Sequence, residues 1–128
     1  MGYKVLVAED ETIIRKGLIC SIDWHELDCY EILEAEDGQE AVEKIQSLHP
    51  DIVIVDINMP IVSGLEVLKQ TFNKYEYVPI IITGYSEFEY AKKAMKYGVR
   101  DYLLKPLDLE ELKQAINNGK IDLKGRLA

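Results

Sequence analysis

Residues 51–60 read D-I-V-I-V-D-I-N-M-P, and this stretch decides the fold. Its first half, Asp51 to Val55, is rich in Val and Ile without polar alternation, which is typical of a strand covered on both faces in a parallel sheet. The run V-P-I-I-I-T, Val78 to Thr83, predicts a second central strand. Pro79 must lie at the start of that strand, because proline cannot donate a hydrogen bond to a sheet ladder.

Three further apolar runs flank these two: Tyr3 to Ala8, Tyr30 to Ala35 and Val99 to Leu104. Between the runs, apolar residues recur at helical spacing, which predicts amphipathic helices with these core positions: Ile14, Leu18 and Ile22; Ala41, Val42, Ile45 and Leu48; Leu65, Leu68 and Phe72; Leu109, Leu112 and Ile116. Strands alternating with helices favour an α/β fold with an open, doubly wound parallel sheet and right-handed crossovers.

Local signals predict where two of the helices begin and end. Ser86 with Glu89 forms a capping box, and Gly98 suits the left-handed stop of the same helix. Asp108 with Glu111 repeats the start signal for the last helix. The helical pattern weakens after Gly119, so we expect residues 1–118 to form the domain and residues 119–128 to be the helix end, a tail or the start of a linker.

Composition narrows the possible functions. The chain has 128 residues, of which 48% are hydrophobic and 30% charged, as in a single globular domain. The formal net charge of −8 disfavours direct binding to nucleic acid. No apolar run is long enough to span a membrane and no secretion signal precedes the first strand, which predicts a cytoplasmic location without a membrane partner. The two cysteines are too few for a disulfide framework or a Cys-rich zinc site.

Polar side chains follow four of the five predicted strands, at the points where the strands end. These are Glu9, Asp10, Asp56, Thr83 and Lys105. The carboxyl ends of parallel strands meet at one edge of a sheet, where ligands bind. Each residue alone would be read as a turn former or a surface charge, but three crowded carboxylates repel one another unless a cation lies among them. The sequence therefore predicts a Mg²⁺ site, since Mg²⁺ prefers carboxylate and carbonyl oxygens.

Phosphoryl transfer is the chemistry that this set of residues suits. Asp56 ends a buried strand, so its fixed carboxylate can act as the nucleophile and form an aspartyl-phosphate. The turn I-N-M-P that follows can present the backbone carbonyl of Asn58 to the metal. Lys105 and Thr83 supply a positive charge and a hydrogen-bond donor for the phosphoryl oxygens.

Four motifs, in this order and spacing, make the sequence similar to the receiver domain of two-component response regulators. They are V-L-V-A-E-D (Val5 to Asp10), D-I-V-I-V-D-I-N-M-P with the following S-G-L-E, I-I-T-G (Ile81 to Gly84) and D-Y-L-L-K-P (Asp101 to Pro106). The resemblance covers about Tyr3 to Asn118. It implies a flavodoxin-like five-stranded sheet in the order 2-1-3-4-5 with five helices.

The resemblance also implies a role for each site residue. Asp56 is the phospho-acceptor, Mg²⁺ is held by Asp10, Asp56 and the Asn58 carbonyl with Glu9 contributing through water, and Lys105 binds the phosphate. Thr83 and Tyr102 are the switch residues, and a cis peptide bond precedes Pro106. The domain catalyses only its own phosphorylation and dephosphorylation, so it is not classed as an enzyme.

Partners follow from the same resemblance. A sensor histidine kinase donates the phosphoryl group, and phosphorylation can promote a homodimer through a tyrosine-rich surface near Tyr90 and Tyr97. The segments I-D-W-H-E-L (Ile22 to Leu27) and T-G-Y-S-E-F-E-Y-A-K-K-A (Thr83 to Ala94) resemble receivers that precede an AraC-type helix-turn-helix domain. DNA would be bound only through such an output domain outside this chain, acting in transcription regulation.

Three alternatives remain at this point. The chain could be a stand-alone receiver that acts as a protein-interaction adaptor. A haloacid-dehalogenase-like phosphohydrolase would also use an Asp nucleophile and Mg²⁺, but it needs a second Asp two residues on as general acid, where Asn58 stands. A flavodoxin-like FMN module would need a phosphate loop rich in Ser, Thr or Gly after the first strand, where E-D-E-T stands.

Overall fold

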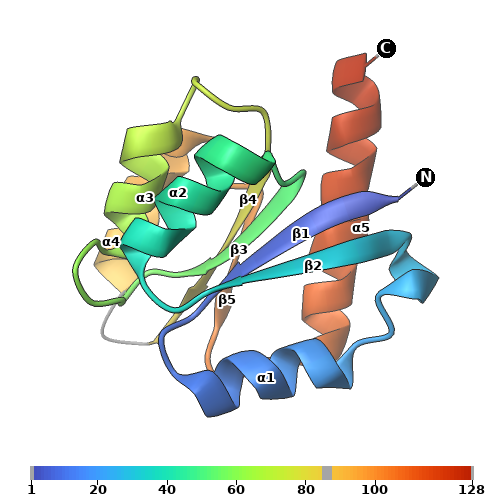
Figure 1. The fold of residues 1–128 in the computed structure, drawn as a ribbon, viewed down its shortest axis with the longest axis horizontal. Coiled ribbons are helices and arrows are strands. Elements are labelled where there is room, and N and C mark those ends of the chain that lie inside the picture. Colours follow the sequence, from blue (N-terminus) through green and yellow to red (C-terminus); the bar gives the residue numbers. More distant parts are fainter. Residues whose placement is uncertain (1, 85–87, 128) are drawn as a thin grey trace.

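The computed structural model describes residues 2–84 and 88–127, and a single twisted sheet with helices on both faces organises them (Figure 1). In chain order the elements are β1 (Tyr3–Ala8), α1 (Thr12–Ser21), a 3₁₀ turn (His25–Leu27), β2 (Cys29–Ala35), α2 (Gly38–Leu48), β3 (Ile52–Asp56), α3 (Gly64–Thr71), β4 (Val78–Thr83), α4 (Phe88–Ala94), a second 3₁₀ turn (Met95–Tyr97), β5 (Asp101–Leu104) and α5 (Leu109–Leu127).

The strand order is β2-β1-β3-β4-β5, and all four neighbouring pairs are parallel. This confirms the fold class and order predicted above. β3 and β4 are buried along their whole length, as their unbroken apolar sequences require. The register pairs Asp56 with Ile82 and Thr83 with Leu104, which brings the ends of β3, β4 and β5 to one edge.

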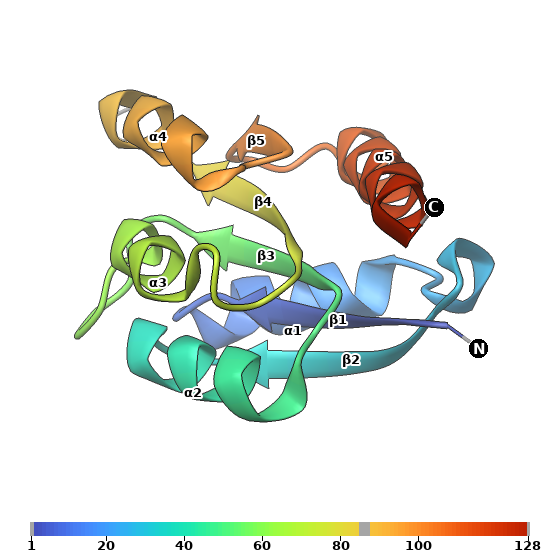
Figure 2. The ribbon, with the colours of Figure 1, turned by 90° about the horizontal axis from the view of Figure 1, so that it is seen from above.

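Alternate residues of the strands enter two separate cores. Figure 2 shows α2, α3 and α4 together on one side of the sheet, with α5 on the other. Val5, Ile54 and Ile80 pack with residues of α1 and α5. Leu6 and Val55, from the opposite faces of the same strands, pack with residues of α2, α3 and α4. The two cores together hold the strand ends rigidly in place.

The buried face of α1 differs from the prediction by one position. Ile14 is 36% exposed, whereas Arg15, Leu18 and Ile22 are buried. The face follows an i, i+3, i+7 spacing that begins with an arginine instead of an apolar residue. The predicted i, i+4, i+8 stripe was therefore wrong at its first residue.

The last helix, α5, runs past Gly119 to Leu127. Glycine here permits a close approach, since a Cβ at position 119 would lie 3.1 Å from Cγ1 of Val78 on β4. Beyond it, Lys120 donates to the carbonyl of Leu27 at 2.8 Å, and Arg100 forms a 2.8 Å ion pair with Asp122. These tertiary contacts outweigh the poor helix propensity of glycine, so residues 119–127 continue the helix.

Other helix signals are confirmed where the structure describes them. Asp108 accepts hydrogen bonds from the amides of Glu110 and Glu111 at the start of α5. Gly98 takes the left-handed conformation, with φ of 75°, after the turn that follows α4. Ser86, the predicted cap of α4, lies outside the described residues. Within those residues, no helix combines the length and apolar character that a membrane crossing needs.

Candidate functional site

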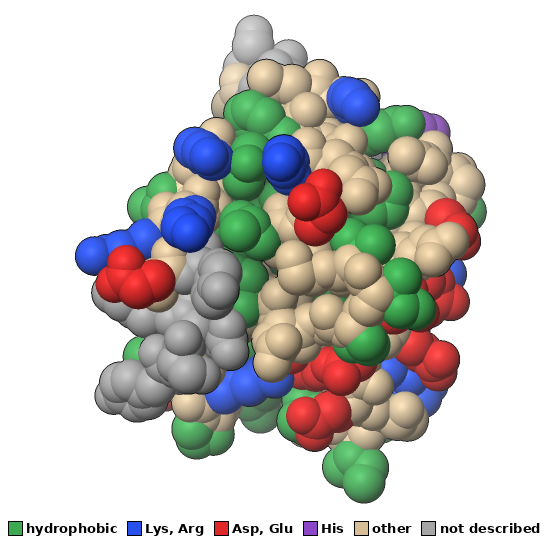
Figure 3. Space-filling model, turned by 90° about the vertical axis from the view of Figure 1, so that its left-hand side faces the viewer, with side chains coloured by type: hydrophobic (Ala, Val, Ile, Leu, Met, Phe, Trp, Pro, Cys, Tyr) green, Lys and Arg blue, Asp and Glu red, His purple; other side chains and the backbone are tan. Residues whose placement is uncertain are grey.

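The carboxyl edge of the sheet gathers the charged residues predicted for the site. Glu9 and Asp10 follow β1, Asp56 ends β3, and one carboxylate oxygen from each lies within 4.8 Å of the others. Glu9 and Asp56 are buried, and Asp10 is partly exposed. Figure 3 shows acidic side chains gathered in the lower half of the face that it presents, below a group of basic ones.

Lys105 provides the positive charge at this edge. Its Nζ donates to Oδ2 of Asp56 at 2.7 Å and lies 3.1 Å from Oε1 of Glu9. The backbone amide of Lys105 donates to the carbonyl of Thr83, which fixes the start of the following loop against β4. Burial lowers the pKa of Lys105, but hydrogen bonds to Asp56 and Glu9 outweigh burial, so the net pKa is raised. Lys105 is therefore positively charged in the unphosphorylated protein.

Two backbone features hold Asp56, one at its carboxylate and one at its main chain. The amide of Asn58 donates to Oδ1 of Asp56 at 3.0 Å. Gly64, the first residue of α3, packs so closely that a Cβ there would lie 2.3 Å from the carbonyl oxygen of Asp56. The amide of Gly64 donates to the carbonyl of Ile57 at 2.9 Å. The loop after β3 is thus closed tightly by the start of α3.

Glu9 carries the clearest sign that a cation belongs here. Its Oε2 accepts a hydrogen bond from the amide of Glu11 at 3.1 Å. Its Oε1 is buried, and its charge is faced by the ammonium of Lys105 at 3.1 Å, which also pairs with Asp56. Burial, together with the charge of Asp56, raises the pKa of Glu9 from 4.5 to about 7. A divalent cation would add to the positive charge of Lys105 and relieve the remaining repulsion between the three carboxylates.

The two predicted switch residues lie next to this cluster without joining it. Thr83 is fully buried at the end of β4, and its hydroxyl donates to the carbonyl of Gly84 at 3.1 Å. Tyr102 lies on β5, paired with Ile81, and is 37% exposed. The peptide bond between Lys105 and Pro106 is cis, as the resemblance implied.

Arg15 is a residue of this region that the sequence reasoning missed. Its side chain reaches from α1 to the end of β1 and is only 3% exposed. It donates to the carbonyl of Glu9 and forms an ion pair with Glu34 of β2. The signal that could have found it is its place on the core face of α1, with Glu34 on the neighbouring strand β2 and Glu36 just after it.

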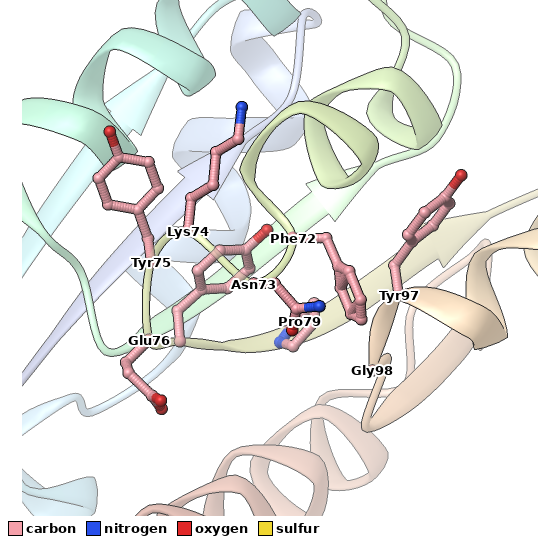
Figure 4. A pocket seen from close by; sticks show the side chains of 9 residues that line it. Phe72, Asn73, Lys74, Tyr75, Glu76, Pro79, Tyr97 and Gly98 are labelled. Atoms are coloured by element: carbon pink, nitrogen blue, oxygen red, sulfur yellow. The ribbon is translucent and has the colours of Figure 1, made fainter.

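The surface has an apolar groove beside the charged edge and a pocket at the opposite edge of the sheet. A largely apolar groove of about 630 Å³ runs from the site along α1, between Ile13, Ile14 and Leu18 on one side and Pro106 and Leu107 on the other. A pocket of about 480 Å³ lies where β4 and β5 begin, at the opposite edge of the sheet (Figure 4). Aromatic residues such as Phe72 and Tyr97 line that pocket, with Glu76 as its single carboxylate, so it lacks the ligand set of the acidic edge.

Comparison with known proteins agrees with this geometry. Residues 5–117 match the response regulator receiver domain. The chain belongs to this family. A transcriptional regulatory protein of Bacillus subtilis, YesN, described as uncharacterized, is 43% identical to this receiver over 123 residues, which are 95% of this chain and 33% of YesN. The transcriptional regulatory protein HptR of Staphylococcus aureus is 40% identical over 110 residues, or 86% of this chain and 43% of HptR.

Solved receiver structures are similar over the whole chain. The receiver domain of AraT, a response regulator from Geobacillus stearothermophilus, has 43% sequence identity and a TM-score of 0.92, with 100% of both chains covered. A two-component transcriptional regulator AraC from Clostridium phytofermentans has 30% identity and the same TM-score over 99% of each chain. The receiver described here spans 33% to 45% of the length of the first curated relatives that it matches.

Proposed function

We propose that this receiver accepts a phosphoryl group on Asp56 from the phosphohistidine of a sensor kinase. The observation that carries the proposal is the convergence of Glu9, Asp10, Asp56 and Lys105 at one edge of the sheet. A carboxylate oxygen of Asp56 attacks the phosphorus atom, the P–N bond breaks, and the imidazole leaves with the bonding electrons. Lys105 then pairs with the oxygens of the new aspartyl-phosphate.

We assign Asp10, Asp56 and the backbone carbonyl of Asn58 as the Mg²⁺ ligands, with Glu9 contributing through water. The gathering of three carboxylates, with one oxygen from each within 4.8 Å of the others, supports a cation at this position. When bound, Mg²⁺ would neutralise the charge on the phosphoryl oxygens. The amide of Asn58 keeps Asp56 oriented, because its hydrogen bond to Oδ1 limits rotation of the carboxylate.

We propose that the kinase docks in the apolar groove beside α1. Ile13 is 88% exposed at the open side of this groove, and Lys105 and Pro106 line the end that meets the acidic site. An exposed apolar surface adjoining a charged reaction centre can hold a partner helix while its histidine reaches Asp56.

Phosphorylation of Asp56 changes the surface of the receiver through Thr83 and Tyr102. The phosphoryl group adds acceptor oxygens, so the hydroxyl of Thr83 exchanges its bond to Gly84 for one to the phosphate, and Tyr102 rotates into the vacated space. The β5 surface then differs between the two states. The names of the relatives support transcription as the output, through a DNA-binding domain outside this chain.

A phosphorylation-dependent homodimer is the second proposed consequence. Met95 and Leu104 are exposed apolar residues near the changing surface. Of the two tyrosines predicted to contribute, Tyr97 packs edge-on against Phe72, and the side chain of Tyr90 lies outside the described part of the molecule. Sizing the protein with and without beryllofluoride tests this step, and an unchanged size would contradict it.

The phospho-acceptor is tested by incubation with acetyl phosphate and Mg²⁺. Intact mass should increase by one phosphoryl group in the wild type and not in Asp56→Asn. Asp101→Asn, at the far end of β5, is the control and should still be labelled. Labelling of Asp56→Asn at another residue would exclude the assignment, and sustained phosphate release from small esters would favour a phosphohydrolase instead.

A further inference from the structure

We propose that Arg15 is a positioning residue for the metal-binding turn, which it sets by holding the carbonyl of Glu9. This inference rests on the proposed function, because the metal ligands that it concerns are those assigned above. Arg15 touches none of the reacting atoms and acts only through the backbone between Glu9 and Asp10.

The contacts of Arg15 join the turn after β1 to the end of β2. Nη1 donates to the carbonyl oxygen of Glu9 at 2.7 Å in a buried hydrogen bond. Nε donates to Oε1 of Glu34 at 2.8 Å, and Nη2 lies 3.5 Å from Glu36. The planar guanidinium can satisfy these partners at once, because its donors form a fixed fork. In Figure 1, a short loop leads from the end of β1 to the start of α1, the helix that carries Arg15.

The position of this hydrogen bond matters because β1 leaves the sheet at Glu9. The amide of Glu9 still donates to Ala35 of β2 at 3.1 Å. The carbonyl of Glu9 shares a rigid peptide plane with the amide of Asp10. Holding that carbonyl therefore fixes the direction in which Asp10 departs from the sheet, and with it the approach of the Asp10 carboxylate to Asp56.

Pairing with Glu34 allows the buried guanidinium of Arg15 to lie close to a metal site. An unpaired guanidinium would repel a second cation, but the carboxylate of Glu34 neutralises it. Glu34 also accepts from Lys16 of α1 at 2.8 Å. Lys16 is exposed and does not contact Glu9, so it serves as a matched control for the loss of a positive charge next to Glu34.

The test separates positioning from stability. The Mg²⁺ dissociation constant is measured from the amide resonances of Asp10 and Asn58 during titration with MgCl₂, and the melting temperature is measured in EDTA. Arg15→Met should weaken Mg²⁺ binding about tenfold, the low end of effects from residues that orient metal ligands. Lys16→Met should leave the constant unchanged.

The double variant Arg15→Met with Glu34→Leu removes the ion pair between the buried guanidinium and the partly exposed carboxylate, and leaves apolar side chains in its place. It should recover the melting temperature of the wild type while Mg²⁺ binding stays about tenfold weaker. Recovery of both quantities together would overturn the inference, because Arg15 would then contribute only to stability.

Arg15→Lys keeps the charge and gives an answer if the double variant does not fold. A single ammonium cannot reproduce the fork that reaches both Glu9 and Glu34, so weaker Mg²⁺ binding is expected, and an unchanged constant would contradict the inference. Failure of the proposed function has a different signature: the wild type itself would not bind Mg²⁺, or Asp10→Asn would bind it equally well.

Discussion

Nζ of Lys105 lies 2.7 Å from Oδ2 of Asp56, although the two residues are 49 positions apart in the sequence. The same ammonium lies 3.1 Å from Oε1 of Glu9. Before phosphorylation, Lys105 is therefore the counter-ion of the proposed nucleophile. Its positive charge faces the same carboxylates that Mg²⁺ would bind. Lys105 pairs with carboxylates before transfer and with phosphoryl oxygens after it. Removing its charge should therefore raise the affinity for Mg²⁺ and lower the rate of phosphorylation.

Lys105→Gln should bind Mg²⁺ more tightly and accept phosphate more slowly. Removing one positive charge beside the carboxylates makes binding of Mg²⁺ more favourable. We expect a dissociation constant about tenfold lower, which corresponds to roughly 1.4 kcal/mol. Labelling by acetyl phosphate should be slower by tenfold or more, because the phosphoryl oxygens lose their ammonium partner. Mg²⁺ titration and the initial rate of labelling measure the two effects on the same sample.

The control is Lys113→Gln, which removes a lysine from a surface ion pair with Glu110 on α5. Both quantities should match the wild type. If Lys105→Gln instead weakened Mg²⁺ binding, the ammonium would be organising the carboxylates rather than competing with the cation.

Gly64→Ala should destabilise the loop that carries Asp56. The added Cβ would lie 2.3 Å from a backbone oxygen, which cannot move as a flexible side chain does. We expect a loss of about 2 kcal/mol in the free energy of unfolding and slower labelling by acetyl phosphate. Urea denaturation measures the first effect.

Gly17→Ala is the matched control, because a Cβ at that position on α1 meets nothing within 4 Å. It should stabilise the protein by about 0.5–1 kcal/mol through helix propensity. Equal effects of the two substitutions would mean that the close approach at Gly64 relaxes freely.

Much of this site could be predicted from the sequence, because sheet topology does most of the positioning. β3 and β4 are continuous apolar runs, so their parallel pairing and their ends could be inferred. Because the ends of these strands lie at one edge of the sheet, the proximity of Asp56 and Lys105 follows from the strand order alone. The three acidic residues and the lysine are all found where they were expected.

The parts that the sequence did not predict depend on tertiary contacts of single side chains. Arg15 breaks the apolar pattern of α1, and its burial follows from partners on β1 and β2 that are not neighbours in the sequence. Gly119 resembles a helix stop, but its contact with Val78 and the ion pair of Asp122 extend α5 past it. Local propensity cannot anticipate such compensations.

Ile13→Asp should slow phosphoryl transfer from a histidine kinase that phosphorylates the wild type, without changing labelling by acetyl phosphate. Ile13 is exposed and lines the groove beside the site, so a charge there opposes docking of an apolar partner surface while leaving the carboxylates intact. We expect at least tenfold slower transfer, comparable to losing one well-buried apolar contact at an interface. Ile121→Asp, which changes an isoleucine that is also exposed, on α5, is the control and should transfer normally. Equal slowing by both variants would place the docking surface elsewhere.

The raised pKa of Glu9 has a direct consequence for stability. The carboxyl titrates near its ordinary value of 4.5 in the unfolded chain and at about 7 in the folded one. Between these values the folded state binds more protons, so the free energy of unfolding should fall as pH rises from about 4.5 to about 7 and then level off. Glu34 acts in the opposite sense: hydrogen bonds from Lys16 and Arg15 lower its pKa below 4.5, so its contribution is lost only at more acidic pH.

Denaturation of the metal-free protein from pH 5 to pH 8 isolates this effect. The wild type should lose up to about 3 kcal/mol across the range, the equivalent of the full pKa shift. Glu9→Gln should show little change, because glutamine stays neutral in both states. Saturating Mg²⁺ should flatten the wild-type curve, since a bound cation favours the ionised carboxylate, and the stabilisation that it gives should therefore be larger at pH 8 than at pH 5. A wild-type curve that stays flat without metal would show that Glu9 ionises in the folded site as easily as in water, with Lys105 fully compensating for its burial.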